Sequence, residues 1–110
     1  MQASLSNPEQ LDRITFDPSS GEYVLIISTT GAWEDSKEEQ ELLLQKINNY
    51  SSFVIKGELL QHYPQAEGKA VRIQIDSTEI IPQKANRLIG QAQKLLSQHE
   101  ITLCTNLIHK

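Results

Sequence analysis

The order of strand-like and helix-like patterns along the chain sets the strongest limit on its fold. Two strand patterns come first, and two amphipathic helix patterns then alternate with two further strand patterns. Strand–helix–strand crossovers are right-handed in nearly all proteins, so two crossovers in one direction place both helices on the same face of a sheet. We therefore expect an α+β fold: a two-layer α/β sandwich with a four-stranded sheet and two helices, in the order β-β-α-β-α-β.

A β-hairpin is predicted at the start. Residues 13–16 alternate polar and apolar side chains, whereas residues 23–27 are aromatic, apolar or β-branched throughout. Between them, Pro18 presets φ for a turn, and Gly21 can adopt the positive φ that closes a longer hairpin loop. Residues 24–27 are apolar on both faces, so this strand is either covered on both sides or covered on one side and used in a contact on the other.

Each helix pattern starts with a recognisable signal. Ser36 and Glu39 have the spacing of a capping box, and Gly57 marks the end of the apolar stripe that follows. This stripe contains Leu42, Leu43, Ile47, Tyr50, Phe53 and Val54. Pro82 suits the first turn of the second helix, which we expect to end near residue 98. Its apolar face contains Ala85, Leu88, Ile89, Ala92, Leu95 and Leu96.

The remaining segments complete the pattern. Residues 58–63 predict one or two further helical turns that stop at Pro64. The next strand pattern, 71–76, places Val71, Ile73 and Ile75 on one face and Arg72, Gln74 and Asp76 on the other. Residues 101–105 predict the last strand. We expect a flexible N-terminus at 1–11, a single α+β domain at 12–105 and a C-terminal tail at 106–110.

Composition fits one self-sufficient domain in a reducing compartment. The chain has 110 residues, of which 38% are hydrophobic and 22% are charged, as in ordinary globular proteins. Its one cysteine, Cys104, excludes an intrachain disulfide and a multi-cysteine metal site within this chain. No apolar run reaches the roughly 18 residues of a membrane span, and residues 1–10 have no signal-peptide pattern. We expect a cytoplasmic location.

The charge is unevenly distributed. The net charge is −4, with 3 basic and 9 acidic residues in 1–55 against 7 and 5 in 56–110. The overall negative charge argues against nucleic acid as a partner. The asymmetry can steer a basic partner or favour head-to-tail self-contact, and the plainer interpretation is a pair of solvated helix faces.

Residues that carry enzyme chemistry are scattered. His62, His99 and His109 lie far from one another in sequence, and Cys104 lies in an apolar strand pattern that favours a buried, inert thiol. Metal-binding spacings and phosphate-binding glycine loops are absent from the sequence. We therefore predict no catalytic residue, no metal ligand and no cofactor.

Six side chains are candidates for an interface: Trp33, Tyr50, Tyr63, Arg72, Gln74 and Asp76. Trp33 lies just before a helix cap, where an aromatic ring can anchor the helix start or meet a partner. The two tyrosines can instead lie in the core or at its edge, and Arg72 can pair with Asp76 or Glu22.

Several segments of the chain form a recognisable pattern: GEYVL (21–25), Trp33, LQKINNY (44–50), Phe53-Val54, Tyr63-Pro64 and GKAVRIQID (68–76). In this pattern the chain resembles a family of small bacterial proteins of unknown function. The resemblance covers most of residues 12–100 and implies a compact domain of bacterial origin. No activity and no site residue follow from it.

These features favour a non-enzymatic cytosolic protein-interaction domain that binds another protein or forms a homodimer, with the polar face of 71–76 as a candidate dimerisation surface. One version is an immunity- or antitoxin-like protein whose acidic first helix masks a basic toxin. The alternative is a small enzyme or ligand-binding regulatory domain. Its site would form at a dimer interface from Tyr50, His62, Tyr63 and Arg72.

Overall fold

The computed structural model describes residues 13–29, 33–34 and 36–108. Its strands are β1 (Arg13–Asp17), β2 (Glu22–Thr29), β3 (Val71–Ser77) and β4 (Ile101–Leu107). Its helices are α1 (Lys37–Ile55), α2 (Glu58–His62) and α3 (Gln83–Ser97), and a 3-10 turn, η1, spans Pro64–Ala66. The predicted α+β class and element order are confirmed. The short α2 occupies the place where further helical turns were expected.

The β1–β2 hairpin forms around a turn that satisfies its own polar groups. The Asp17 carboxylate accepts hydrogen bonds from the backbone N–H and the hydroxyl of Ser19, at 3.0 and 2.6 Å. Gly21 donates its N–H to the Asp17 carbonyl at 2.8 Å and adopts a φ of 74°, a conformation that a side chain would strain. The two strands are antiparallel, with Ile14 opposite Leu25.

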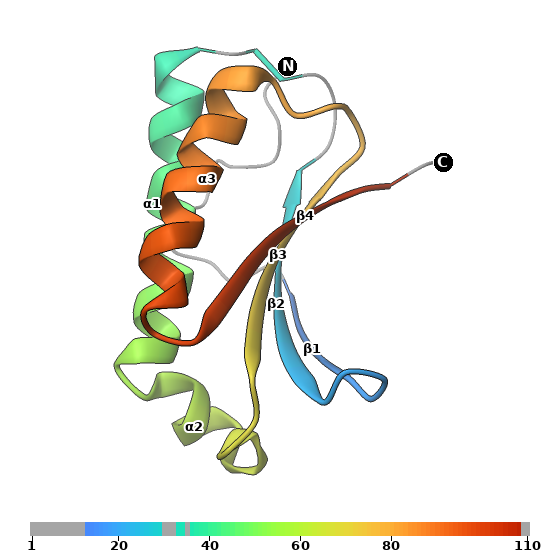
Figure 1. The fold of residues 1–110 in the computed structure, drawn as a ribbon, viewed down its shortest axis with the longest axis vertical. Coiled ribbons are helices and arrows are strands. Elements are labelled where there is room, and N and C mark those ends of the chain that lie inside the picture. Colours follow the sequence, from blue (N-terminus) through green and yellow to red (C-terminus); the bar gives the residue numbers. More distant parts are fainter. Residues whose placement is uncertain (1–12, 30–32, 35, 109–110) are drawn as a thin grey trace.

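The sheet has the order β1-β2-β3-β4, and β2, β3 and β4 run parallel. Both crossovers, through α1 and through α3, lie on the same face of this sheet (Figure 1). The helices therefore form one layer and the strands the other, as the sequence predicts. In Figure 1 no described helix covers the opposite face of the sheet.

The core lies between the two layers. One register row crosses the sheet through Ile14, Leu25, Ile73 and Leu103. Leu25 and Ile73 are 0% exposed at its centre, Leu103 is 4% exposed in β4, and Ile14 in β1 is only partly buried. The two long helices contribute the buried residues Leu43, Ile47, Tyr50, Ala85, Ile89, Ala92 and Leu96.

Helix α1 begins as the capping box predicts. The Ser36 hydroxyl accepts the Glu39 amide N–H at 3.1 Å. The Glu39 carboxylate is buried and accepts the Glu34 amide N–H at 3.0 Å, so the same residue also holds the preceding loop. Gly57, with a φ of 85°, separates α1 from α2.

The structure differs from the sequence-based expectations at several points. β4 continues to Leu107, because Asn106 and Leu107 pair with the end of β3, so the predicted tail at 106–110 begins inside a strand. Leu95, expected on the buried face of α3, is 64% exposed. Pro82 caps α3 instead of lying inside its first turn. The expected flexible N-terminus, 1–11, lies outside the described residues.

Within the described residues, no helix combines the length and the apolar character that a membrane span needs.

Candidate functional site

The sheet face without a described helix carries an ion-pair cluster around Arg72. Its guanidinium pairs with Glu22 at 2.6 Å and with Asp17 at 3.1 Å, which joins β3 to both strands of the hairpin. The hydrogen bonds from Ser19 and the Arg72 guanidinium hold the pKa of the Asp17 carboxyl well below its usual range. Of the two partners considered from the sequence, Glu22 is found, and Asp17 takes the place of Asp76 because the hairpin register sets Asp17 opposite Glu22.

Gln74 and Asp76 bind each other on the same face. The Gln74 amide donates to Asp76 Oδ1 at 2.7 Å, and Asn106 of β4 donates to the same oxygen at 3.3 Å. The Cys104 thiol lies 4.0 Å from Oε1, the side-chain amide oxygen of Gln74, and burial raises the pKa of the thiol. A raised pKa keeps the thiol protonated at neutral pH. Cys104 is half-buried and not fully buried as expected, and its inertness stays a prediction.

Two apolar side chains lie within this polar network. Val24 and Ile26 face away from the helix layer and are 2% and 4% exposed. Arg72 and Gln74 of β3 stand next to them in register. The second strand is therefore buried on both faces, the first of the two alternatives that its sequence left open. The polar groups around it are largely engaged within the chain, which gives no specific support to this face as a dimerisation surface.

Trp33 holds the loop that precedes α1. Its indole Nε1–H donates to the Ser77 hydroxyl at 3.0 Å, and its ring packs against the core. Ser77 is 1% exposed and donates in turn to the Glu79 carbonyl at 2.5 Å. This bonding supports the structural alternative for Trp33, because the half-buried side chain links the segment before α1 to the last residue of β3.

Tyr50 is a core residue and not a surface candidate. It is 0% exposed, and its hydroxyl donates to the Ile26 carbonyl at 3.1 Å. Because no part of its side chain is available to a partner, we correct its inclusion among the interface candidates. Tyr63 is half-buried, with its ring centroid 6.2 Å from that of Tyr23.

The four residues considered for a composite enzyme site lie apart. His62 stacks on Phe53 with ring centroids 5.9 Å apart, near the end of α1. Arg72 points to the sheet face opposite the one that Tyr50 packs against. Tyr63 packs beside the hairpin. One chain therefore does not bring these side chains together, and a site built from two chains stays a prediction.

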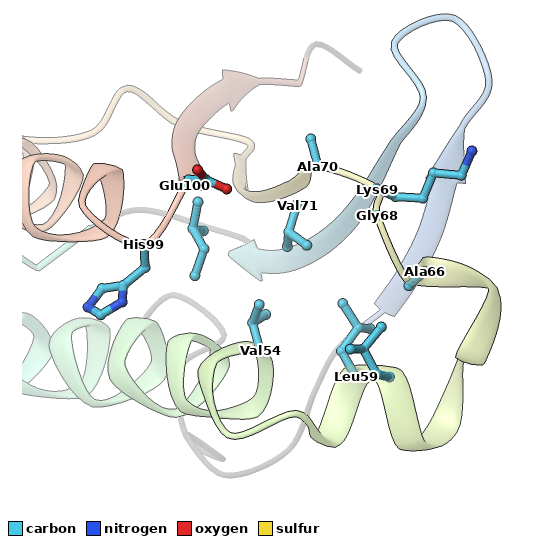
Figure 2. A pocket seen from close by; sticks show the side chains of 11 residues that line it. Val54, Leu59, Ala66, Gly68, Lys69, Ala70, Val71, His99 and Glu100 are labelled. Carbon is cyan, nitrogen blue, oxygen red and sulfur yellow. The ribbon is translucent and has the colours of Figure 1, made fainter.

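A cavity of about 470 Å³ lies between α2 and the starts of β3 and β4 (Figure 2). Val54 and Leu59 give it an apolar lining, while Lys69 and His99 lie at opposite ends and point away from its centre. Among the described residues, no group of three His, Cys, Asp or Glu side chains is placed to hold a metal ion. The cavity is a recess of mixed polar and apolar lining, in which Lys69 and His99 do not converge.

The two edges of the sheet differ in their exposed chemistry. β1 is five residues long and carries two charges, Arg13 and Asp17. β4 is seven residues long, and its sequence, ITLCTNL, contains neither a charge nor a proline. Among the described strands, none pairs with the outer side of β4. Gln93 of α3 donates to the Leu103 carbonyl at 2.9 Å and satisfies one backbone acceptor in this strand.

Sequence reasoning found the last strand but not its position at an edge. Local alternation reports which residues share a face, whereas strand order depends on contacts between distant segments. The signal that was present is the lack of charge in 101–107. The sequence pattern did not single out the exposed residues of this strand, which are Thr102, Thr105, Asn106 and Leu107.

The described fold defines a small two-layer α+β domain with one helix-covered sheet face. Comparison with known protein families matches residues 3–109 to a family of unknown function, DUF6572. The chain belongs to this family, which confirms that it is a member of an uncharacterised domain family. Searches of curated proteins and of solved structures found no significant match.

Proposed function

We propose that this protein is a non-enzymatic, cytoplasmic interaction domain of bacterial origin that binds an extended segment of a partner protein along β4. The observation that carries the proposal is the long, uncharged, proline-free β4 edge. Natural sheets usually protect such edges with charges, prolines, bulges or short length. β1 shows two of these protections, and β4 shows neither.

The structure of β4 suits strand addition. Its first half is anchored, since Ile101 and Leu103 are 3% and 4% exposed. Its second half is open, since Thr105 and Asn106 are exposed and Leu107 is 42% exposed. An added strand gains affinity from main-chain hydrogen bonds and specificity from alternate side chains. A strand that is packed at one end and has no described strand on its outer side presents both.

Charge indicates the chemistry of the partner. Glu34, Glu38 and Glu41 are exposed around the start of α1, and the chain as a whole carries a net charge of −4. Electrostatic complementarity then favours a basic partner, because it accelerates encounter and rejects acidic proteins. An immunity- or antitoxin-like role is the version of this proposal that joins strand addition to a basic target.

The test compares one substitution on the two edges. Thr105→Lys places a charge on the β4 edge, and Thr15→Lys places the same charge on β1, where the native residue is also exposed. The wild-type protein and both variants are purified gently from the native host and weighed by native mass spectrometry. We expect a partner mass with the wild type and with Thr15→Lys, and its loss with Thr105→Lys.

Thermal unfolding of each variant serves as the control for folding, since surface substitutions of this kind change stability by about 0.5 kcal/mol or less. Equal retention of the partner by both folded variants would contradict the proposal. A small ligand retained in place of a protein would contradict it too.

A further inference from the structure

The outer surface of the helix layer carries an apolar groove between α1 and α3. The groove has a volume of about 570 Å³. Leu44 and Ile55 line it from α1 and are 39% and 49% exposed, while Leu95 lines it from α3 and is 64% exposed. Exposed apolar side chains thus line the groove from both helices, and an exposed apolar patch of this kind often marks a binding surface.

The charges beside this groove have opposite signs on the two helices. Helix α3 carries the exposed cations Lys84 and Arg87 in its first two turns and contains no acidic residue. Helix α1, after Lys37, carries Glu38 and Glu41 exposed at its start. In the described part of the chain, neither Glu41 nor Arg87 takes part in an ion pair. Both charges are therefore available to a partner.

Helix direction places these charges at the same end of the layer. Both helices connect parallel strands, so both run antiparallel to β2, β3 and β4 and start at the same end of the helix layer (Figure 1). At 3.6 residues per turn, Glu41 and Arg87 lie on the outward sides of their helices, away from the buried stripes that meet the sheet. Glu41 and Arg87 thus lie on the same outward face of the helix layer, near the end where both helices start.

We infer that this face is a homodimer interface, with a second copy of the chain related by a two-fold axis parallel to the helices. Such an axis sets α1 of one protomer across from α3 of the other, with both helix starts at the same end. Glu41 of each copy then faces Arg87 of its partner, and Leu44 and Leu95 enter the facing groove. One two-fold rotation therefore both covers the apolar groove and pairs the opposite charges.

The size of this face determines how stable the homodimer is expected to be. A helix of 19 residues, the length of α1, is about 28 Å long and about 10 Å wide, so two helices present a projected area on the order of 500–600 Å². This lies at the lower end of specific interfaces, which bury roughly 800 Å² per partner. We expect a reversible dimer that dissociates on dilution in the micromolar range.

The test uses charge exchange between protomers. Sedimentation equilibrium of the wild type from about 1 to 200 μM is expected to show a monomer–dimer equilibrium. Glu41→Lys and Arg87→Glu each create two like-charge contacts in their own homodimer, so each is expected to weaken dimerisation about tenfold or more. Mixed together, they make both contacts attractive again, and the mixture is expected to dimerise as the wild type does.

Leu95→Gln tests the apolar part and is expected to weaken the dimer about tenfold. The inference is overturned if the wild type stays monomeric over the whole range, if Leu95→Gln dimerises normally, or if mixing the two charge variants restores nothing. Thr105→Lys separates this inference from strand addition at β4, because it is expected to leave the homodimer intact. A dimer lost with Thr105→Lys and kept with Leu95→Gln would place self-association at β4.

Discussion

The strands β1 and β4 are the two edges of one sheet, yet they are held in place by different forces. β1 is fixed by its hairpin and by the Asp17–Arg72 ion pair on the uncovered face, while Phe16 on its other side is 42% exposed. β4 is fixed by apolar side chains packed under α3, and Leu103 is only 4% exposed. An edge strand can therefore be firmly anchored through its side chains while no described strand pairs with its outer side.

The largest expected effect compares equivalent residues on the two edges. Leu103 and Ile14 occupy the same register row, but only Leu103 is fully packed. Truncation of a buried leucine costs about 2–4 kcal/mol, and truncation of a half-buried isoleucine costs roughly half of that. We therefore expect Leu103→Ala to lower the free energy of unfolding clearly more than Ile14→Ala, as measured by urea denaturation. Equal losses of unfolding free energy in the two variants would show that β1 and β4 are anchored equally.

The next effect concerns the polar anchor of β1. Arg72→Met keeps the aliphatic part of the side chain and removes both ion pairs, which leaves Asp17 and Glu22 without their cation. Charged hydrogen bonds of this kind contribute about 1–2 kcal/mol when partly shielded. We expect a loss of that size in urea denaturation. Lys94→Met, at an exposed position on α3, is the matched control and should change little.

A smaller effect depends on pH. The pKa of the Asp17 carboxyl is lowered in the folded protein, so the carboxylate adds stability above its ordinary pKa and loses this contribution as the pH falls towards the folded value. The difference in unfolding free energy between the wild type and Asp17→Asn is therefore expected to be constant near neutrality and to shrink below about pH 4. Urea titrations at several pH values measure it. A difference that stays unchanged down to the acid limit of folding would argue against the Asp17 contacts.

The smallest effect is kinetic. Burial raises the pKa of the Cys104 thiol, so less thiolate is present at a given pH than in the unfolded chain. Alkylation of the folded protein is expected to be several-fold slower at mildly alkaline pH than in denaturant, and its rate should rise only at higher pH. A folded protein that reacts as fast as the denatured one would show that β4 opens to the reagent.

The sequence predicts the helices and strands of this fold better than it predicts which distant residues pair with one another. Alternation in 71–76 and helical spacing in 83–97 are local signals, and both elements form where these signals lie. Asp17 and Arg72 are 55 residues apart, and their pairing depends on a register that no local pattern contains. The open edge of β4 was missed for the same reason. The burial of β2 on both faces, with Val24 and Ile26 on the face away from the helices, was one of two outcomes consistent with an apolar run.

The most direct test of strand addition at β4 is backbone hydrogen exchange in this strand, with and without the partner captured from the native host. If an extended segment adds to the sheet, amides in 101–107 become strongly protected on binding, while those in 13–17 keep their exchange rates. Protection confined to another surface, with 101–107 unchanged, would contradict the assignment of β4 as the binding edge.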